Sequence, residues 1–284
     1  MFLQEQITKL QTSMPAMPPV ATNNGFTLAL NRLQAVSLDE LSKASLMDRT
    51  DTKFFFPAQA LPELLELVGN HYGVLEMNGL RCIPYESLYF DTAGFDLYLQ
   101  HHNGKGKRHK IRYRRYVNSN KTYFEIKLKT PQGRTIKNRT TVPGICVPLG
   151  QKAAHLLEQH TLLTPQDIEP VLWVWYYRIT LMSLNFPERV TIDLGLHFIN
   201  PLKQATWQNM CILEVKQNSA NRHSVVVDTL KQLHIHPKSL SKYCIGVATT
   251  YPQLKHNQFK SKLLQIEIIE HLYAPTAFAG AAGN

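Results

Sequence analysis

Basic side chains alternate with apolar ones along several segments of the chain. In residues 110–114, KIRYR, the three bases Lys110, Arg112 and Arg114 share one face, because successive side chains of a strand point to opposite faces. The same alternation recurs in three further segments, EIKLK at 125–129, RVTID at 189–193 and EVK at 214–216. Arginine binds phosphate through paired hydrogen bonds and lysine acts as a movable point charge. Strands of this kind could bind a phosphorylated polyanion.

Two interpretations of these strands are open. In a half-buried sheet the charged face simply meets water, which is the ordinary case for any single strand. If the sheet closes into a barrel, one face of every strand lines the lumen, and the bases form an anion-binding tunnel. Interior cations are costly unless something neutralises them, as phosphate groups and a few carboxylates would do. Four such strands together favour the tunnel.

The composition agrees with a polyanionic partner. The chain has 284 residues, with 31 Lys and Arg against 21 Asp and Glu, which gives a net charge of +10. This excess favours nucleic acid, an anionic membrane surface or a phosphorylated substrate without choosing among them. A hydrophobic content of 44% supplies enough apolar material for a sizeable core and excludes a disordered chain.

Membrane, secretory and metal-cluster classes are disfavoured. The most hydrophobic run contains Arg178 and is shorter than the roughly 18 apolar residues of a spanning helix. The N-terminus lacks the features of a secretory signal, so we expect a cytoplasmic protein. The four cysteines are far apart and form no CxxC pair, which predicts reduced thiols rather than a zinc site or a disulfide framework.

Helical patterns flank the strand-rich part of the chain. We expect helices near residues 3–11, 38–46, 58–72, 150–160, 221–234 and 263–272. The chain is therefore expected to contain an N-terminal helical arm at 1–45, a central sheet domain at 46–250, and a C-terminal helix with a flexible tail at 251–284.

Other short motifs extend the charged strands. In RTDTKFFF at 49–56, Arg49, Asp51 and Lys53 share a face. The segments FEIKLK and TIKNR, joined by a PQG turn, predict a hairpin that sets Glu125 and Lys127 opposite Lys137 and Arg139. Further charged motifs are YYR at 176–178, ERVTID at 188–193, ILEVK at 212–216 and SKYCIG at 241–246.

In this order, the motifs resemble the VTC domain of polyphosphate polymerases, in the triphosphate tunnel metalloenzyme superfamily. The resemblance covers roughly residues 46–250 and rests on the ordered set of motifs, which also includes SLYFDTAGFDLY at 87–98. It implies an α+β protein whose antiparallel closed β-barrel, of about eight strands with flanking helices, encloses a triphosphate-binding tunnel. Residues 46–250 would then be the tunnel domain.

The resemblance also implies roles for individual residues. The bases expected to act in catalysis are Lys53, Arg112, Arg114, Lys127, Arg178 and Arg189. Those expected to bind the rest of the substrate are Lys137, Arg139, Lys216 and Lys242. Glu214 matches the family's metal ligand, for Mn²⁺ or Mg²⁺. For Glu125 and Asp193, pairing with neighbouring bases is the favoured role.

The sequence departs from the wider pattern at two places. Where family members often have a base before the Arg-x-Arg strand, this chain has His101 and His102, which are poorer phosphate ligands when neutral. Other tunnel enzymes open with Glu-x-Glu-x-Lys, whereas here Asp51 precedes Lys53. The second departure disfavours a two-metal triphosphatase or cyclase.

Three functions remain open. The first is a polymerase that moves the γ-phosphoryl group of ATP onto inorganic polyphosphate; the second is an inorganic triphosphatase or tripolyphosphatase; the third is a non-enzymatic module that binds polyphosphate or RNA. The charged faces lack the exposed aromatic pattern of single-strand readers, so no specific nucleic acid partner is expected. ATP and inorganic polyphosphate or triphosphate are the expected partners, with no membrane span and an undetermined oligomeric state.

Overall fold

The computed structural model describes residues 24–43, 49–218 and 223–273, and its architecture is α+β. All of its strands join one sheet of eleven strands. The strands are β1 (Gln34–Val36), β2 (Arg49–Pro57), β3 (Tyr72–Leu75), β4 (Ile83–Asp91), β5 (Arg108–Tyr116), β6 (Lys121–Lys129), β7 (Thr135–Val142), β8 (Glu169–Ser183), β9 (Glu188–Ile199), β10 (Gln204–Trp207) and β11 (Met210–Asn218).

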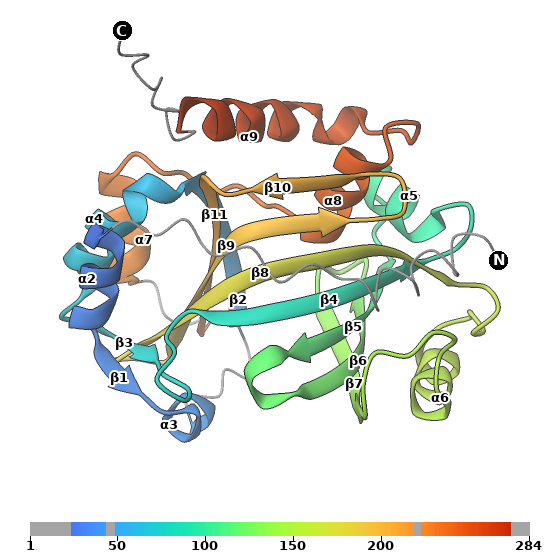
Figure 1. Cartoon of the computed structure of the whole chain (residues 1–284), viewed down its shortest axis with the longest axis horizontal. Coiled ribbons are helices and arrows are strands. Elements are labelled where there is room, and N and C mark those ends of the chain that lie inside the picture. Colours follow the sequence, from blue (N-terminus) through green and yellow to red (C-terminus); the bar gives the residue numbers. More distant parts are fainter. Residues whose placement is uncertain (1–23, 44–48, 219–222, 274–284) are drawn as a thin grey trace, which may run out of the picture.

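Helices gather at the two ends of the sheet and along one edge (Figure 1). They are α2 (Asn24–Arg32), α3 (Leu38–Lys43), α4 (Leu61–Val68), α5 (Asp96–His102), α6 (Gln151–His160), α7 (Val225–Gln232), α8 (Lys242–Thr250) and α9 (Lys260–Leu272), with short 3₁₀ turns η1 (Ala58–Ala60), η2 (Val117–Ser119) and η3 (Asn257–Phe259). In Figure 1, α2, α4 and α7 lie together at one end, and α5 and α6 lie at the other.

The closed barrel predicted from the sequence is wrong. Eight strands follow one another in the order β2-β11-β9-β8-β4-β5-β6-β7, and every neighbouring pair is antiparallel. Within the described ranges, the two end strands β2 and β7 do not pair with each other, so the sheet stays open. Alternation assigns the two faces of each strand, but it carries no information on whether the first and last strands meet.

The two faces of the sheet differ in character. Directly paired residues of neighbouring strands share a face, and the predicted bases of β2, β5, β6, β7, β8, β9 and β11 all fall on the same one. We call this the basic face. The opposite face carries apolar side chains such as Phe54, Leu213 and Ile192, which pack against α2, α4 and α7.

Part of the basic face is covered by α8. Ser241 caps this helix, its hydroxyl accepting a hydrogen bond from the Cys244 amide. At Gly246 an added Cβ would approach Phe198 to 2.5 Å and Leu172 to 2.6 Å, so only glycine allows α8 to pack so closely on β8 and β9. The apolar cluster beneath it, which includes Tyr176 and Tyr243, leaves the charged part of the face beside it.

Most of the expected helices are confirmed, with shifted ends. Expectations near 38–46, 58–72, 150–160, 221–234 and 263–272 correspond to α3, η1 with α4, α6, α7 and α9. The expected helix near 3–11 and the flexible tail lie outside the described residues. Helices α2, α5 and α8 were not predicted, and neither was strand β1. In the described part of the chain no helix is long and apolar enough to cross a membrane, and the four cysteines are free.

Candidate functional site

Three carboxylates form ion pairs with bases of the basic face. Glu125 of β6, Asp193 of β9 and Glu214 of β11 each bind at least two cations. None of the three carboxylate side chains is more than 18% exposed. Because such pairs are formed on rigid strands, they hold long basic side chains in fixed positions.

Glu125 is the centre of the first group. Its Oε2 accepts hydrogen bonds from Arg112 at 3.0 Å (Nε) and 2.8 Å (Nη2), and Lys137 lies 2.5 Å from Oε1. Arg114 approaches Oε2 at 3.8 Å. Burial alone would raise the pKa of Glu125, but Arg114, Arg112 and Lys137 hold this pKa well below its usual value. The carboxylate is therefore ionised at any physiological pH.

Asp193 is the centre of the second group. Arg178 of β8 binds it through two parallel hydrogen bonds, and Lys242 at the start of α8 binds the same carboxylate. Although burial opposes ionisation, Arg178 and Lys242 lower the pKa of Asp193 to about 2. The Arg178 guanidinium also lies over the rings of Tyr85 and Tyr176, 5.0 and 5.3 Å from their centroids, where cation–π attraction restrains it further.

Glu214 is the centre of the third group. It pairs in register with Lys53 of β2, and its two oxygens bind Lys53 and Lys216. These two lysines overcome the effect of burial and hold the pKa of Glu214 well below its usual value. The group therefore presents an ionised carboxylate between two ammonium groups.

Two neighbouring lysines carry charge that no carboxylate neutralises directly. Lys110 of β5 and Lys127 of β6 pair in register, and among the described residues neither forms an ion pair. Burial lowers the pKa of both; for Lys127 the value falls to about 7, with Lys110 the strongest charged contributor and Glu214 opposing it. Desolvated, mutually repelling ammonium groups of this kind favour binding of an anion.

A charged cavity of about 450 Å³ is lined by residues from strands at the two ends of the strand order. Lys53 of β2 lines it on one side, and Lys110 and Lys127 line it on the other. Lys53 also contributes to the lowered pKa of Lys127. The open sheet therefore curves far enough to bring bases from strands distant in the path to one cavity.

Arg114, Arg189 and Arg139 occupy different environments. Arg114 is buried, and its Nε has no hydrogen-bond partner among the described residues. Arg189 pairs in register with Lys216 and donates a hydrogen bond to the Leu41 carbonyl. Arg139 lies over the Tyr123 ring, 4.7 Å from its centroid, and is exposed. The structure therefore brings all of the predicted bases to one face and puts Arg139 on its solvent side.

Several residues of the charged cavity were not among the predicted site residues. They are His101 of α5, Arg108 and Lys110 of β5, Lys129 of β6 and Lys262 of α9. Arg108, Lys110 and Lys129 continue the alternation of their strands, and this signal could have identified them. His101 and Lys262 come from helices, so only packing brings them here. Burial and the nearby bases, Lys110 first, lower the pKa of His101 to about 2, which leaves it neutral.

Taken together, the basic face carries arginines and lysines, most of them held in position by ion pairs, with fewer carboxylates than basic side chains. The chemistry of such an array suits binding of phosphate oxygens, for which no reacting side chain is needed. Among models of protein families, the model of the VTC domain matches residues 48–251. The chain belongs to the VTC domain family. The resemblance of the motifs to the VTC domain is thereby confirmed.

Solved structures similar to this VTC domain are distant in sequence. A proposed adenylate cyclase from Vibrio parahaemolyticus is 12% identical, with 72% of this chain and 99% of that one covered and a TM-score of 0.43. A proposed adenylate cyclase from Bacillus halodurans is 14% identical, with 69% and 96% covered and a TM-score of 0.46.

A third similar structure is a proposed adenylyl cyclase from Hippeastrum, described as having a dominant triphosphatase activity. It is 15% identical, with 72% of this VTC domain chain and 97% of that chain covered and a TM-score of 0.47. Among curated proteins, none matches.

Proposed function

We propose that this VTC domain is a polyphosphate polymerase, which transfers the γ-phosphoryl group of ATP to the end of an inorganic polyphosphate chain. The observation that carries the proposal is the arrangement of bases around one face. Carboxylates hold one set of bases in place, while Lys110 and Lys127 share a cavity with no carboxylate bound to either of them in the described residues. Phosphoryl transfer requires mainly alignment and charge neutralisation, which such an array supplies.

The arginines are suited to hold the triphosphate of the donor. Arg112 and Arg178 are each bound to a carboxylate, so their guanidinium groups are oriented before a ligand arrives. The Nε of Arg114 has no hydrogen-bond acceptor among the residues that the structure describes. Binding to preorganised donors loses little conformational entropy, and the charge-assisted hydrogen bonds hold the reacting phosphates in line. Arg189 would extend this set.

The lysines are suited to hold the acceptor chain. Lys53, Lys137, Lys216 and Lys242 each share a carboxylate with another base, so phosphate oxygens can compete for their ammonium groups. The acceptor is a phosphate oxygen that is already anionic, and no general base is needed to remove a proton from it. The reaction forms a new phosphoanhydride bond and breaks the β–γ bond of ATP, with ADP leaving.

Glu214 is the proposed ligand for Mn²⁺ or Mg²⁺. Its carboxylate is ionised, and no group of three or more metal-binding side chains occurs in the described ranges. A hard divalent ion fits one carboxylate when phosphate oxygens and water complete its coordination. When bound, the ion would neutralise developing charge on the transferred phosphoryl group. Lys53 and Lys216 would orient the Glu214 oxygens.

The deciding experiment incubates the full chain with ATP and Mn²⁺ and separates the products by size. Long phosphate chains are the expected product. Free phosphate alone would contradict the polymerase and support the triphosphatase. Binding of polyphosphate without any turnover of ATP would support the non-enzymatic module. The matched control is Glu214→Gln, which removes the metal ligand and keeps the size of the side chain.

A further inference from the structure

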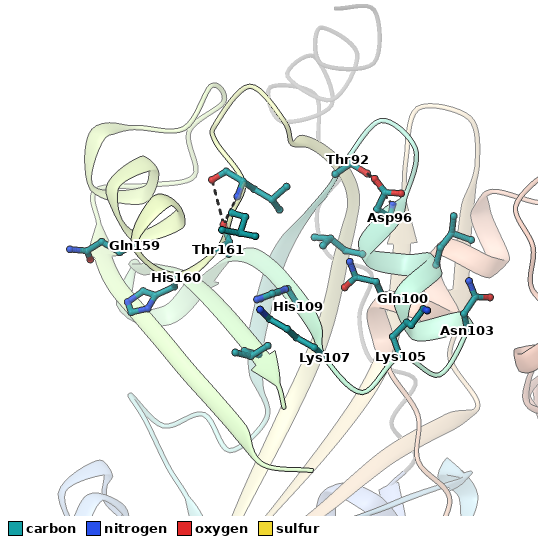
Figure 2. Close-up of a pocket in the computed structure, with 15 residues that line it drawn as sticks. Thr92, Asp96, Gln100, Asn103, Lys105, Lys107, His109, Gln159, His160 and Thr161 are labelled. Carbon is teal, nitrogen blue, oxygen red and sulfur yellow. Dashed lines mark hydrogen bonds between the residues drawn. The ribbon is translucent and has the colours of Figure 1, made fainter. Parts of the chain in front are cut away.

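A second cavity lies on the outer side of the sheet, away from the basic face. Its volume is about 920 Å³, and α5, the loop after it, β5 and β6, and the end of α6 enclose it (Figure 2). It shares no lining residue with the charged cavity. The separation follows from strand alternation, since Arg108 and Lys110 point to the basic face and His109 between them points outward. We call it the outer cavity.

The polar groups of the outer cavity favour an anion. Lys105 and Lys107 line it with exposed side chains and form no ion pair within the described chain, and Figure 2 shows Lys107 beside His109. Burial, with a contribution from Lys107, lowers the pKa of His109, so its ring is neutral and can donate one hydrogen bond. The only acid in the lining is Asp96, whose Oδ2 accepts a hydrogen bond from the Thr92 hydroxyl at 2.8 Å.

The lining also contains apolar and amide groups that inorganic phosphate would not use. Five leucines line the cavity, Leu97, Leu99, Leu128, Leu162 and Leu163. Leu162, which follows α6, is 98% exposed and lies on the solvent side of the cavity, whereas the other four leucines are partly or fully buried. The amide of Gln100 points into the cavity, and Gln159 and Asn103 lie at its two opposite sides (Figure 2). Few convergent polar groups over an apolar floor are typical of small-molecule sites of about 300–1,000 Å³.

From this juxtaposition we propose that the outer cavity binds a nucleotide-sized organic phosphate, independently of the basic face. Lys105 and Lys107 bind the phosphate, the leucines pack against the base, and the Gln100 amide hydrogen-bonds its polar edge. A polyphosphate chain would leave the leucines and the Gln100 amide without a role. The cavity is walled by α5, the sheet and α6, which suits a small ligand better than an extended peptide.

The test titrates the full chain with AMP by calorimetry in the presence of saturating tripolyphosphate, which occupies the basic face and has no base. AMP is expected to bind under these conditions, and more tightly than either adenosine or inorganic phosphate. Lys105→Gln/Lys107→Gln should weaken AMP binding by at least about tenfold, since two charge-assisted contacts are lost. The matched control is Lys203→Gln/Lys231→Gln, which removes the same charge from exposed lysines outside both cavities.

Three outcomes would overturn the proposal. No binding of AMP by the unmodified chain would show that the cavity does not take a nucleotide. An equal loss of AMP affinity in the two double variants would show that only the net charge of the protein matters. Phosphate binding as tight as AMP binding would deny any role to the leucines and the Gln100 amide. Thermal unfolding of each variant checks that the fold is intact. Because this test needs no turnover, its result is independent of whether the chain is a polymerase.

Discussion

Arg178 and Asp193 form a two-point ion pair across β8 and β9, with Nε to Oδ1 at 2.6 Å and Nη2 to Oδ2 at 2.8 Å. Lys242 from α8 binds the same carboxylate. Replacing Asp193 by Asn would leave two largely buried cations without their partner. Removing one partner of a buried pair costs about 3–5 kcal/mol, and we expect Asp193→Asn to lower the free energy of unfolding by about 3 kcal/mol in urea titrations.

Two further measurements separate this account from a simple packing defect. The pKa of Asp193, about 2, lies below that of an unfolded aspartate at about 3.9. Its ionised form therefore stabilises the fold above about pH 4, and this contribution is lost as pH falls toward 2. The acid loss of stability should be shallower in Asp193→Asn. Tripolyphosphate should also stabilise the variant more than the unmodified chain; equal stabilisation would contradict the account.

Glu214→Gln should have opposite effects on turnover and on binding. ATP turnover with Mn²⁺ should fall by at least about a hundredfold, because metal stabilisation of the transition state is worth several kcal/mol. Tripolyphosphate binding without metal should be unchanged or tighter, since a negative charge between Lys53 and Lys216 has gone. Parallel losses of turnover and metal-free binding would indicate that Glu214 only positions the two lysines.

Arg112 and Arg139 should differ in importance although both belong to the predicted set. Arg112 is largely buried and is oriented by Glu125 and by the Tyr89 hydroxyl, whereas Arg139 is exposed over Tyr123. Arg112→Gln should weaken tripolyphosphate binding by at least about tenfold. Arg139→Gln should change it by less than about twofold, because exposed charges contribute little. Calorimetry on both variants in one buffer checks the difference, and similar losses would refute it.

How far the site could be predicted is clear from β6 and β7. Alternation and the PQG turn predicted a hairpin with Glu125 and Lys127 opposite Lys137 and Arg139. This hairpin is observed, with Glu125 paired to Arg139 and Lys127 paired to Lys137. The faces of the strands are a local property with a period of two, so they can be read from short segments. The same rule placed Lys110 on the face of Arg112 and Arg114, but the family resemblance assigned it no role, so it was not among the predicted site residues.

Other features depend on contacts that no short segment contains. Closure of the sheet is a relation between β2 and β7, and it was predicted incorrectly. The end of β2 at Pro57 and the start of β7 at Thr135 are 78 positions apart in the chain. Helix α8 was missed because its residues include Gly246 and several β-branched side chains, which are poor helix formers; packing on β8 and β9 stabilises it. His101 reaches the charged cavity only because α5 packs beside it.

Protonation of Asp91 should make the stability of the fold near α5 and α8 depend on pH. Its buried carboxylate accepts hydrogen bonds from the amides of Leu97 and Tyr98 in α5 and from the hydroxyl of Tyr243 in α8. Burial raises the pKa of Asp91 to about 6, against these hydrogen bonds. Since this pKa lies above that of an unfolded aspartate, the folded state binds the proton more tightly, and the contribution of Asp91 to stability decreases as pH rises from about 4 to 6.

Asp91→Asn removes this titration. The variant should be less stable than the unmodified chain because its amide cannot accept all of the hydrogen bonds. The gap, which is the difference in free energy of unfolding between the two proteins, should be largest near pH 4. The gap should narrow by about 2–3 kcal/mol on going to pH 7, as measured by urea unfolding at both pH values. A gap that is constant with pH would mean that Asp91 does not titrate in this range.

Lys127 should make anion binding dependent on pH near neutrality. Its pKa of about 7 means that it is charged at pH 6 and largely neutral at pH 8, so its contribution to tripolyphosphate binding should be lost over this interval. Lys127→Arg keeps its charge throughout, because arginine does not deprotonate in proteins. The affinity of the unmodified chain for tripolyphosphate, relative to that of Lys127→Arg, should therefore fall by about threefold to tenfold between pH 6 and 8.5.

The ligand's own titration is common to both proteins and cancels in this ratio. A ratio that does not change with pH would show that Lys127 stays charged and that the neighbouring Lys110 does not destabilise its ammonium form.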